Sequence, residues 1–176
     1  MILRSLLIAA VSLFAISHLG AEEKKSATFE AGGFQFALTE GWAKKETPRA
    51  MSAGGLTYNT EGLAKALDAD FYHFGKGQGG SVEANIARWR SQFDGTPKEV
   101  ERSKLAGGKI EFLHLEGALM SGPPFGKKVP LKDHTMLAAI IESEDGPVFV
   151  KMTGPKDEVA MTIVAIKALV ESAFKN

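Results

Sequence analysis

The glycines between residues 75 and 80 have a spacing that can bind phosphate. Gly75, Gly77 and Gly80 spell G-x-G-x-x-G between an expected strand and an expected helix, and Glu99 and Glu101 follow about 20 residues later. In a dinucleotide site the pyrophosphate lies at the amino terminus of the helix, and the later carboxylate binds the ribose. The motif therefore makes nucleotide binding the first hypothesis to weigh.

Neighbouring residues argue against a nucleotide at this loop. Ser81 and Val82 stand where a P-loop requires Lys followed by Ser or Thr. The later strands are joined by the short turns Gly107-Gly108 and Asp145-Gly146, which permit antiparallel hairpins but not the parallel crossovers of a dinucleotide fold. One alternative remains, in which a small-ligand or anion-binding protein, or an enzyme, uses the loop and the amino terminus of the following helix. Its binding residues would be Gly77, Gly79, Gly80 and Ser81.

A second candidate binding feature is the loop expected from Ser121 to Leu131. It carries Phe125 between a proline and a glycine, then Lys127 and Lys128, and His134 follows just beyond it. Long loops in compact domains often carry function, and an exposed aromatic ring flanked by lysines would form a contact surface. The alternative, which we slightly favour, is that Phe125 folds back onto the core and the lysines are solvated.

Catalytic and metal-binding patterns are missing from the sequence. His73, His114 and His134 are scattered, with no His-x-x-x-His pair and no adjacent carboxylate cluster, so no metal is expected. The absence of cysteine excludes a thiol nucleophile and a thiolate zinc site. No Gly-x-Ser-x-Gly sequence marks a nucleophilic serine. We therefore expect neither catalytic residues nor a cofactor, and a protein that is not an enzyme.

Three segments have the apolar spacing of helices. Residues 81–93 place Val82, Ile86, Trp89 and Phe93 on one helical face. A final helix is expected to start at Pro155, the favoured first position, with acidic residues in its first turn. A weaker helical pattern covers residues 61–68, where Gly62 lowers the propensity.

Strands account for most of the remaining chain. Residues 28–38 alternate around Gly32-Gly33, which indicates a strand or a short hairpin. Short turns separate the later segments, so these strands should pair antiparallel. The further expected strands are 69–74, 98–104, 109–119, 134–142 and 148–153.

Composition excludes several classes of protein. The 176 residues contain 21 Lys and Arg against 21 Asp and Glu, so the net charge is zero, and no basic surplus is present to bind nucleic acid. Hydrophobic residues make up 44% of the chain, which is too many for a disordered protein. The length corresponds to one globular domain.

The amino terminus resembles an export signal. Arg4 precedes an apolar stretch and small residues up to Ala21, and this stretch is short for a membrane span. We predict a signal peptide at 1–21, a flexible lead-in at 22–27 and one globular domain at 28–176; the alternative is an uncleaved amino-terminal anchor. After removal of the signal no membrane span remains, and the protein is expected to be exported, periplasmic or secreted.

Four stretches of the chain resemble PsbP-like domains and a group of exported bacterial proteins near that superfamily: Phe34–Trp42, Phe74–Trp89, Met136–Glu142 and Val150–Pro155. The resemblance implies an α+β fold, a three-layer α/β/α sandwich with a central, mainly antiparallel sheet. Relatives include an extrinsic subunit of photosystem II and a nuclear import factor that binds the small GTPase Ran. These are accessory or binding proteins, so the resemblance carries over no catalytic residues.

The function expected from the sequence is therefore that of an exported, non-catalytic binding or accessory protein. Its partner would be an unidentified protein or a small molecule rather than a nucleic acid.

Overall fold

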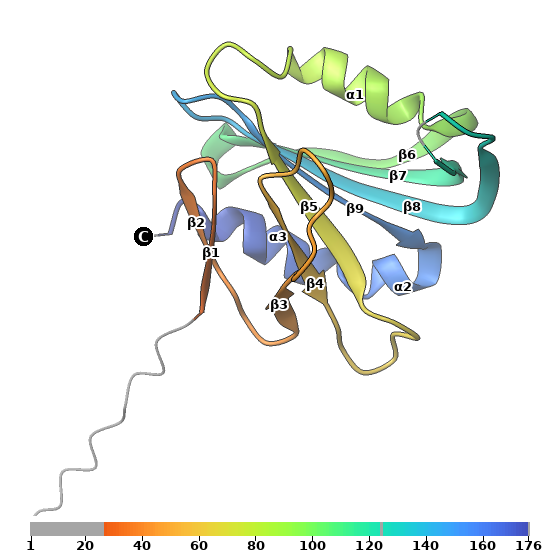
Figure 1. Cartoon of the computed structure of the whole chain (residues 1–176), viewed down its shortest axis with the longest axis horizontal. Helices are drawn as coiled ribbons and strands as arrows, with labels where there is room; N and C mark the ends of the chain where they lie inside the picture. The colour runs from red at the N-terminus through yellow and green to blue at the C-terminus, as the bar shows by residue number, and fades with distance from the viewer. Residues whose placement is uncertain (1–26, 124, 176) are drawn as a thin grey trace, which may run out of the picture.

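The computed structural model describes residues 27–123 and 125–175 (Figure 1). The expected signal peptide at 1–21 and all but the last residue of the lead-in at 22–27 lie outside them. Within the described part of the chain, no helix is long and apolar enough to cross a membrane. The elements are β1 (Thr28–Ala31), β2 (Phe34–Ala37), β3 (Trp42–Lys44), β4 (Gly54–Tyr58), β5 (Leu67–His73), α1 (Val82–Arg90), β6 (Phe93–Leu105), the 3₁₀ turn Ala106–Gly108, β7 (Ile110–Ser121), β8 (Val129–Ile141), β9 (Val148–Pro155), α2 (Lys156–Ala160) and α3 (Ile163–Ser172).

A seven-stranded antiparallel sheet forms the centre of the structure. Its order is β3-β4-β5-β9-β8-β7-β6, and every neighbouring pair is antiparallel. The two turns at Gly107-Gly108 and Asp145-Gly146 join antiparallel partners, which confirms the pairing predicted from their length. Of the two structures expected for residues 28–38, a strand or a short hairpin through Gly32-Gly33, the chain forms the hairpin, as the separate two-stranded sheet β1-β2.

One face of the sheet packs against α2, α3 and the β1-β2 hairpin. Phe36 from the hairpin meets Phe71 of β5 at 5.1 Å between ring centroids, and Phe29 meets Phe71 at 4.8 Å. Ile166 and Leu169 of α3 belong to the same core, which is the larger of the two. We call this side the α3 face.

The opposite face packs against α1, and we call it the α1 face. Figure 1 shows α1 on one side of the sheet and α2 and α3 on the other. The predicted helical stripe is confirmed for Ile86 and Trp89, which are buried against Leu115 and Met136. Phe93 joins the same core from β6, because the helix ends at Arg90 and not at residue 93 as predicted. This second core is smaller and lies over β6 to β9, so the face above β5, β4 and β3 is left to polar side chains.

The predicted three-layer α/β/α sandwich is wrong. The protein is mostly β, and only 18% of it is helical. Three strands of 12 or 13 residues dominate the chain, whereas the longest helix has 10 residues. The helices form no complete layers, because a β-hairpin supplies part of the cover on the α3 face and a single nine-residue helix lies over the smaller core. Apolar spacing located the helices but overstated the area that they cover.

Three further expectations on local structure need correction. Residues 61–68 form no helix, because Gly62 adopts a left-handed backbone with φ of 94° and the chain enters β5 at Leu67. The last helix is interrupted at Met161–Thr162. The expected loop at 121–131 is shorter than predicted, because β7 continues to Ser121 and β8 begins at Val129.

Candidate functional site

Two adjoining hollows lie on the α1 face, at the edge of the smaller core. The first has a volume of about 200 Å³ and lies between α1 and strands β5 and β9. The second, of about 320 Å³, continues toward the β7-β8 turn and the end of β9. Gln92 and Lys151 line both hollows, so these two residues mark the place where the hollows meet.

Lys151 reaches this junction because of its position in β9. Alternate residues of that strand enter opposite faces: Val150 and Met152 join the core of the α3 face, whereas Phe149 joins that of the α1 face. Lys151 therefore points to the α1 face, where its ammonium donates a hydrogen bond to Gln92 Oε1 at 3.2 Å. Among the described residues, no carboxylate lies within 4.0 Å of this ammonium.

The surroundings of Lys151 disfavour its charged form. Burial is the main cause that lowers the pKa of the lysine, and the nearby Arg49 and Arg88 lower it further. Asp70, the register partner of Lys151 on β5, acts in the opposite direction. The ammonium is therefore a half-buried cation for which the protein supplies only part of the compensating negative charge.

Asp70 compensates for Lys151 only in part, because its carboxylate is also paired with two other cations. Its carboxylate is 3% exposed, with Arg49 Nε at 2.7 Å from one oxygen and Lys45 Nζ at 3.6 Å from the other. Lys45 also contacts Asp68, which lies on β5 together with Asp70. These ion-paired side chains form the polar part of the α1 face, and one of them, Arg49, also lines the second hollow.

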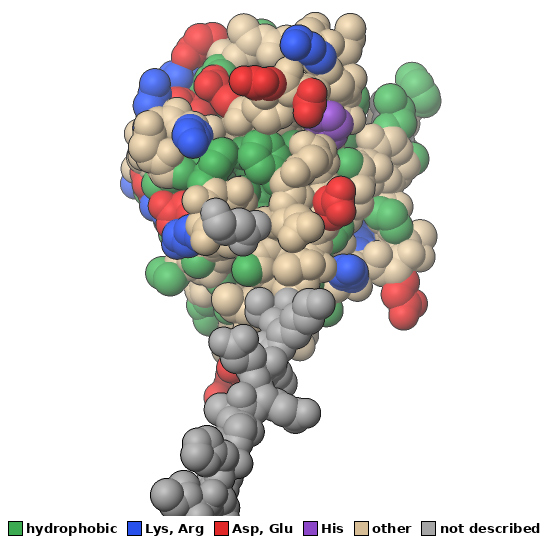
Figure 2. All heavy atoms as spheres, turned by 90° about the vertical axis from the view of Figure 1, so that its left-hand side faces the viewer, with side chains coloured by type: hydrophobic (Ala, Val, Ile, Leu, Met, Phe, Trp, Pro, Cys, Tyr) green, Lys and Arg blue, Asp and Glu red, His purple; other side chains and the backbone are tan. Residues whose placement is uncertain are grey.

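The charged side chains that line the two hollows are all of one sign. They are Arg49, which is paired with Asp70, and Lys65, Arg88 and Lys151, and no Asp or Glu is among the lining residues. The chain as a whole is balanced, with 21 residues of each sign. Figure 2 shows acidic and basic side chains interspersed on the end of the molecule that lies on the left of Figure 1. The single sign is thus a local property, and it favours an anion in the hollows.

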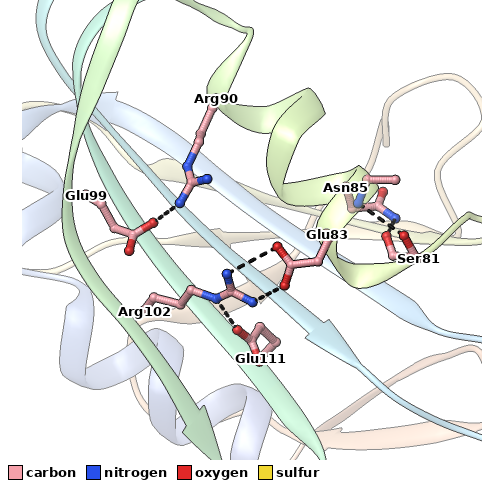
Figure 3. Close-up of polar contacts among 8 residues, drawn as sticks. Ser81, Glu83, Asn85, Arg90, Glu99, Arg102 and Glu111 are labelled. Atoms are coloured by element: carbon pink, nitrogen blue, oxygen red, sulfur yellow. Dashed lines mark hydrogen bonds and ion pairs between the residues drawn. The ribbon is translucent and has the colours of Figure 1, made fainter.

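Ion pairs fix α1, which carries one wall of the first hollow. Figure 3 shows Arg90 paired with Glu99 of β6, and Arg102 of β6 placed between Glu83 of α1 and Glu111 of β7. The hydrogen bonds that the Arg102 guanidinium donates to Glu83, and then the one that it donates to Glu111, raise its pKa. These contacts tie both ends of α1 to the sheet.

The other side of α1 faces the hollow. Asn85, Arg88 and Trp89 recur at helical spacing and Gln92 follows just beyond the helix, so all four line the first hollow. The Arg88 guanidinium donates a hydrogen bond to Asn85 Oδ1, which orients it along this side. Helix geometry thus brings one guanidinium and two amides to the position of Lys151.

The anion site predicted at Gly77, Gly79, Gly80 and Ser81 lies next to this region, but its polar groups have partners of their own. Ser81 Oγ caps the helix by accepting a hydrogen bond from the amide of Ala84 at 3.2 Å. The Asn85 amide donates to the carbonyls of Gly79 and Ser81 at 2.8 and 2.9 Å. Glu83 adds a negative charge to the first helical turn. An anion at this loop stays a prediction, and these contacts weigh against it.

The residues predicted to bind on or near the β7-β8 loop lie in two different surroundings. Phe125 is fully exposed, so the alternative in which it folds back onto the core is wrong. Lys127 and Lys128 are also exposed, and none of the three lines a hollow on the α1 face. His134 alone among the four lies in the wall of the second hollow, with its Nδ1 2.8 Å from the carbonyl oxygen of Lys132.

The three histidines lie on different strands with different neighbours. His73 Nδ1 is 3.4 Å from the carbonyl oxygen of Pro147, whereas His114 is buried with Nε2 3.5 Å from Glu116. His134 belongs to the second hollow. Within residues 27–123 and 125–175, no group of three or more His, Asp or Glu side chains could hold a metal ion.

Sequence reasoning missed the residues at the centre of the site. Lys151, Arg88 and Gln92 were not singled out, because each is an ordinary polar residue when read alone. One signal was available in the strand 148–153, where a lysine follows Val-Phe-Val and precedes Met in a segment that must be buried. A charged residue inside such a segment indicates either an internal ion pair or a ligand.

Comparison with known proteins identifies no matching family model and no matching curated protein. The resemblance to PsbP-like domains stays a prediction, and the function is argued from the hollows themselves.

Proposed function

We propose that this chain is an exported, non-catalytic binding protein that holds a small organic anion, a carboxylate, at Lys151. The ligand occupies the junction of the two hollows on the α1 face. Nucleic acid is not the partner, because the positive charge lines a small concavity rather than a broad surface. The place of action rests on the signal expected at 1–21.

The observation that carries this proposal is a half-buried ammonium with no carboxylate within 4.0 Å among the described residues. A lysine removed in part from water destabilises the folded protein unless a negative group lies beside it. Burial first, and then Arg49 and Arg88, lower the pKa of this lysine against the opposite effect of Asp70. A bound carboxylate supplies the missing charge and can accept hydrogen bonds from the lysine and from Arg88.

Stabilisation by a small carboxylate tests the proposal. The purified chain is titrated with sodium hexanoate, with sodium chloride at the same ionic strength as the reference, and the thermal unfolding midpoint is measured. A ligand that binds only the folded state stabilises it by about 2.7 kcal/mol at a concentration of about 100 times Kd. We expect the midpoint to rise with hexanoate beyond the chloride reference.

The variant Lys151→Met locates the effect. It keeps the length and apolar stem of the side chain but removes the charge, so hexanoate should no longer raise its unfolding midpoint beyond chloride. If hexanoate leaves the wild-type midpoint unchanged, the proposed function is wrong. If hexanoate stabilises both proteins equally, the carboxylate binds elsewhere, and the assignment to Lys151 is wrong.

A further inference from the structure

The first hollow has an aromatic end beyond Lys151. Its apolar wall consists of Tyr72 on β5, Phe74 just after that strand, Trp89 on α1 and Phe149 on β9. The Trp89 and Phe149 rings meet edge to face, with centroids 6.4 Å apart, and Phe74 lies 6.1 Å from Phe149. Four rings from three elements and one loop thus surround one side of a small concavity.

The volume of this hollow fits a single ring. It measures about 200 Å³, whereas sites for drug-sized ligands start at about 300 Å³. A cavity of about 150 Å³ lined by apolar side chains is large enough to bind benzene. A fused or longer ligand would have to extend into the second hollow, which is lined mainly by polar and basic residues.

The same hollow carries polar groups beside its rings. Lys151 and Gln92 stand where it joins the second hollow, and Arg88 and Asn85, which are hydrogen-bonded to each other, line it from α1. The Tyr72 hydroxyl also belongs to the lining; burial, then the neighbouring Asp70, raises the pKa of this phenol, so it remains a neutral hydrogen-bond donor. A ligand that combines an acidic group with a planar apolar group matches this lining of basic side chains and rings.

We propose that the anion bound at Lys151 is a small aromatic carboxylic acid with a single ring. Its ring lies among Tyr72, Phe74, Trp89 and Phe149, where edge and face contacts between rings are available. Its carboxylate faces Lys151 and Arg88. This inference rests on the proposed function, and it adds the chemical class of the apolar part.

Four probes separate the contribution of the ring from that of the charge. Phenylacetate has both features, phenylacetamide keeps the ring without charge, phenethylammonium keeps the ring with the opposite charge, and hexanoate keeps the charge without the ring. Trp42 and Trp89 are the tryptophans of the chain, so in a Trp42→Phe background the emission reports from Trp89 in the hollow. Calorimetric titration of the same protein supplies the dissociation constants independently of emission.

We expect phenylacetate to bind about tenfold more tightly than phenylacetamide, because the amide loses a charge-assisted hydrogen bond. It should bind about fivefold more tightly than hexanoate, because ring contacts exceed those of an alkyl chain. Phenethylammonium should not bind. Saturable quenching or a shift of Trp89 emission should accompany the binding of phenylacetate.

Matched substitutions test the position of the ring. Phe74→Leu removes a half-exposed ring of the hollow but keeps an apolar side chain, and should weaken phenylacetate about threefold and hexanoate by less. Phe174→Leu makes the same change on the α3 face, where Phe174 packs against Phe34, and should alter neither affinity. Circular dichroism of both variants establishes that they are folded.

The outcomes separate the two proposals. If hexanoate binds as tightly as phenylacetate, the aromatic class is wrong while the carboxylate site stands. If neither acid binds, the proposed function fails, and the inference falls with it. If phenethylammonium or phenylacetamide binds best, the hollow does not select an acid, and both proposals are overturned.

Discussion

The two faces of the central sheet solve the same packing problem in different ways. On the α3 face, Lys167 places its ammonium 2.7 Å from both oxygens of Glu101. On the α1 face, Lys151 contacts only the neutral amide of Gln92. The protein thus supplies a carboxylate partner for Lys167, whereas a carboxylate partner for Lys151 would come from a bound ligand.

The apolar packing of the two faces differs in the same sense. The core of the α3 face includes the three rings of Phe29, Phe36 and Phe71 in mutual contact. The aromatic residues of the α1 face instead border a hollow of about 200 Å³. The comparison indicates that the packing of the α3 face stabilises the fold. The α1 face is packed around a hollow and leaves Lys151 without a close carboxylate in the described part of the chain, as is common at binding sites.

The largest effect should come from removing a ring of the α3 face. Phe71→Ala deletes a fully buried ring and leaves a cavity between the sheet and the hairpin, which should lower the free energy of unfolding by about 3–5 kcal/mol. Chemical denaturation measures the loss. Phe74→Ala, on the α1 face, should cost less than about 1 kcal/mol because the ring is 44% exposed. Equal losses for the two variants would contradict the comparison.

The next effect concerns the buried carboxylate of the α1 face. Asp70→Asn removes the negative charge that faces Arg49 and Lys45, which should lower the free energy of unfolding by about 1–2 kcal/mol, because the largely buried Lys45 and the exposed Arg49 lose a buried partner while Lys45 keeps Asp68. It should also tighten hexanoate binding, since the potential at Lys151 becomes more positive. Asp68→Asn is the matched control, and it should cost less than about 1 kcal/mol because Asp68 is more exposed. A stable Asp70→Asn protein with unchanged hexanoate affinity would refute the electrostatic account.

A smaller effect of opposite sign is expected at the two lysines. Lys151→Met should raise the free energy of unfolding by up to about 1 kcal/mol in the absence of ligand, because a half-buried charge with no carboxylate of the described residues within 4.0 Å is replaced by an apolar chain. Lys167→Met should lower it by at most about 1 kcal/mol, because it leaves Glu101 without its partner at a half-exposed position. Denaturation of both variants under the same buffer gives the comparison. If Lys151→Met instead lowers the free energy of unfolding, the charge of Lys151 does not destabilise the folded protein.

Much of the fold follows from local pattern in the sequence. Alternation around Gly32-Gly33 and the short turns at Gly107-Gly108 and Asp145-Gly146 predicted hairpins that the structure confirms. The layer arrangement could not be predicted in this way. Whether a hairpin or a helix covers a face depends on long-range contacts such as Phe34 with Phe174, and spacing within a segment says nothing about them.

The candidate site was harder to predict than the fold. Lys151 lies on β9 and Arg88 on α1, and more than 60 residues separate them in the sequence. Only the packing of α1 across β9 brings them to one hollow. His134 was singled out for its place after a loop and does line the second hollow, whereas Phe125 was chosen from the same loop and points into solvent. A turn can be located from Pro and Gly, but the direction in which its side chains point is set by the strands on either side.

The smallest effect concerns His114, a buried titratable group on the α3 face. Burial is the main cause that holds its pKa below the usual 6.5, while the carboxylates of Glu116 and Glu101 act in the opposite direction. The unfolded chain therefore binds a proton more readily than the folded protein between the lowered pKa and 6.5. It follows that the free energy of unfolding decreases as the pH falls below 6.5, by at most about 1.4 kcal/mol per pH unit for one proton. Above this range the imidazole is neutral in both states and contributes no slope.

His114→Gln isolates this slope. The free energy of unfolding of the wild type and of the variant is measured by denaturation from about pH 5 to about pH 7.5. Near pH 7.5 the two free energies should depend on pH in the same way, and below about pH 6.5 the wild type should lose stability relative to the variant. Glu101 and Glu116 do not titrate in this pH range, because their hydrogen bonds with Lys167 and Lys156 lower the pKa of both carboxyls below 4.5. Their contribution to the free energy of unfolding is therefore lost only at more acidic pH. Parallel curves over the whole range would mean that the imidazole is accommodated in its charged form. The α3 face would then tolerate a buried cation as the α1 face does, and the distinction between the faces would rest on Lys151 and its hollow alone.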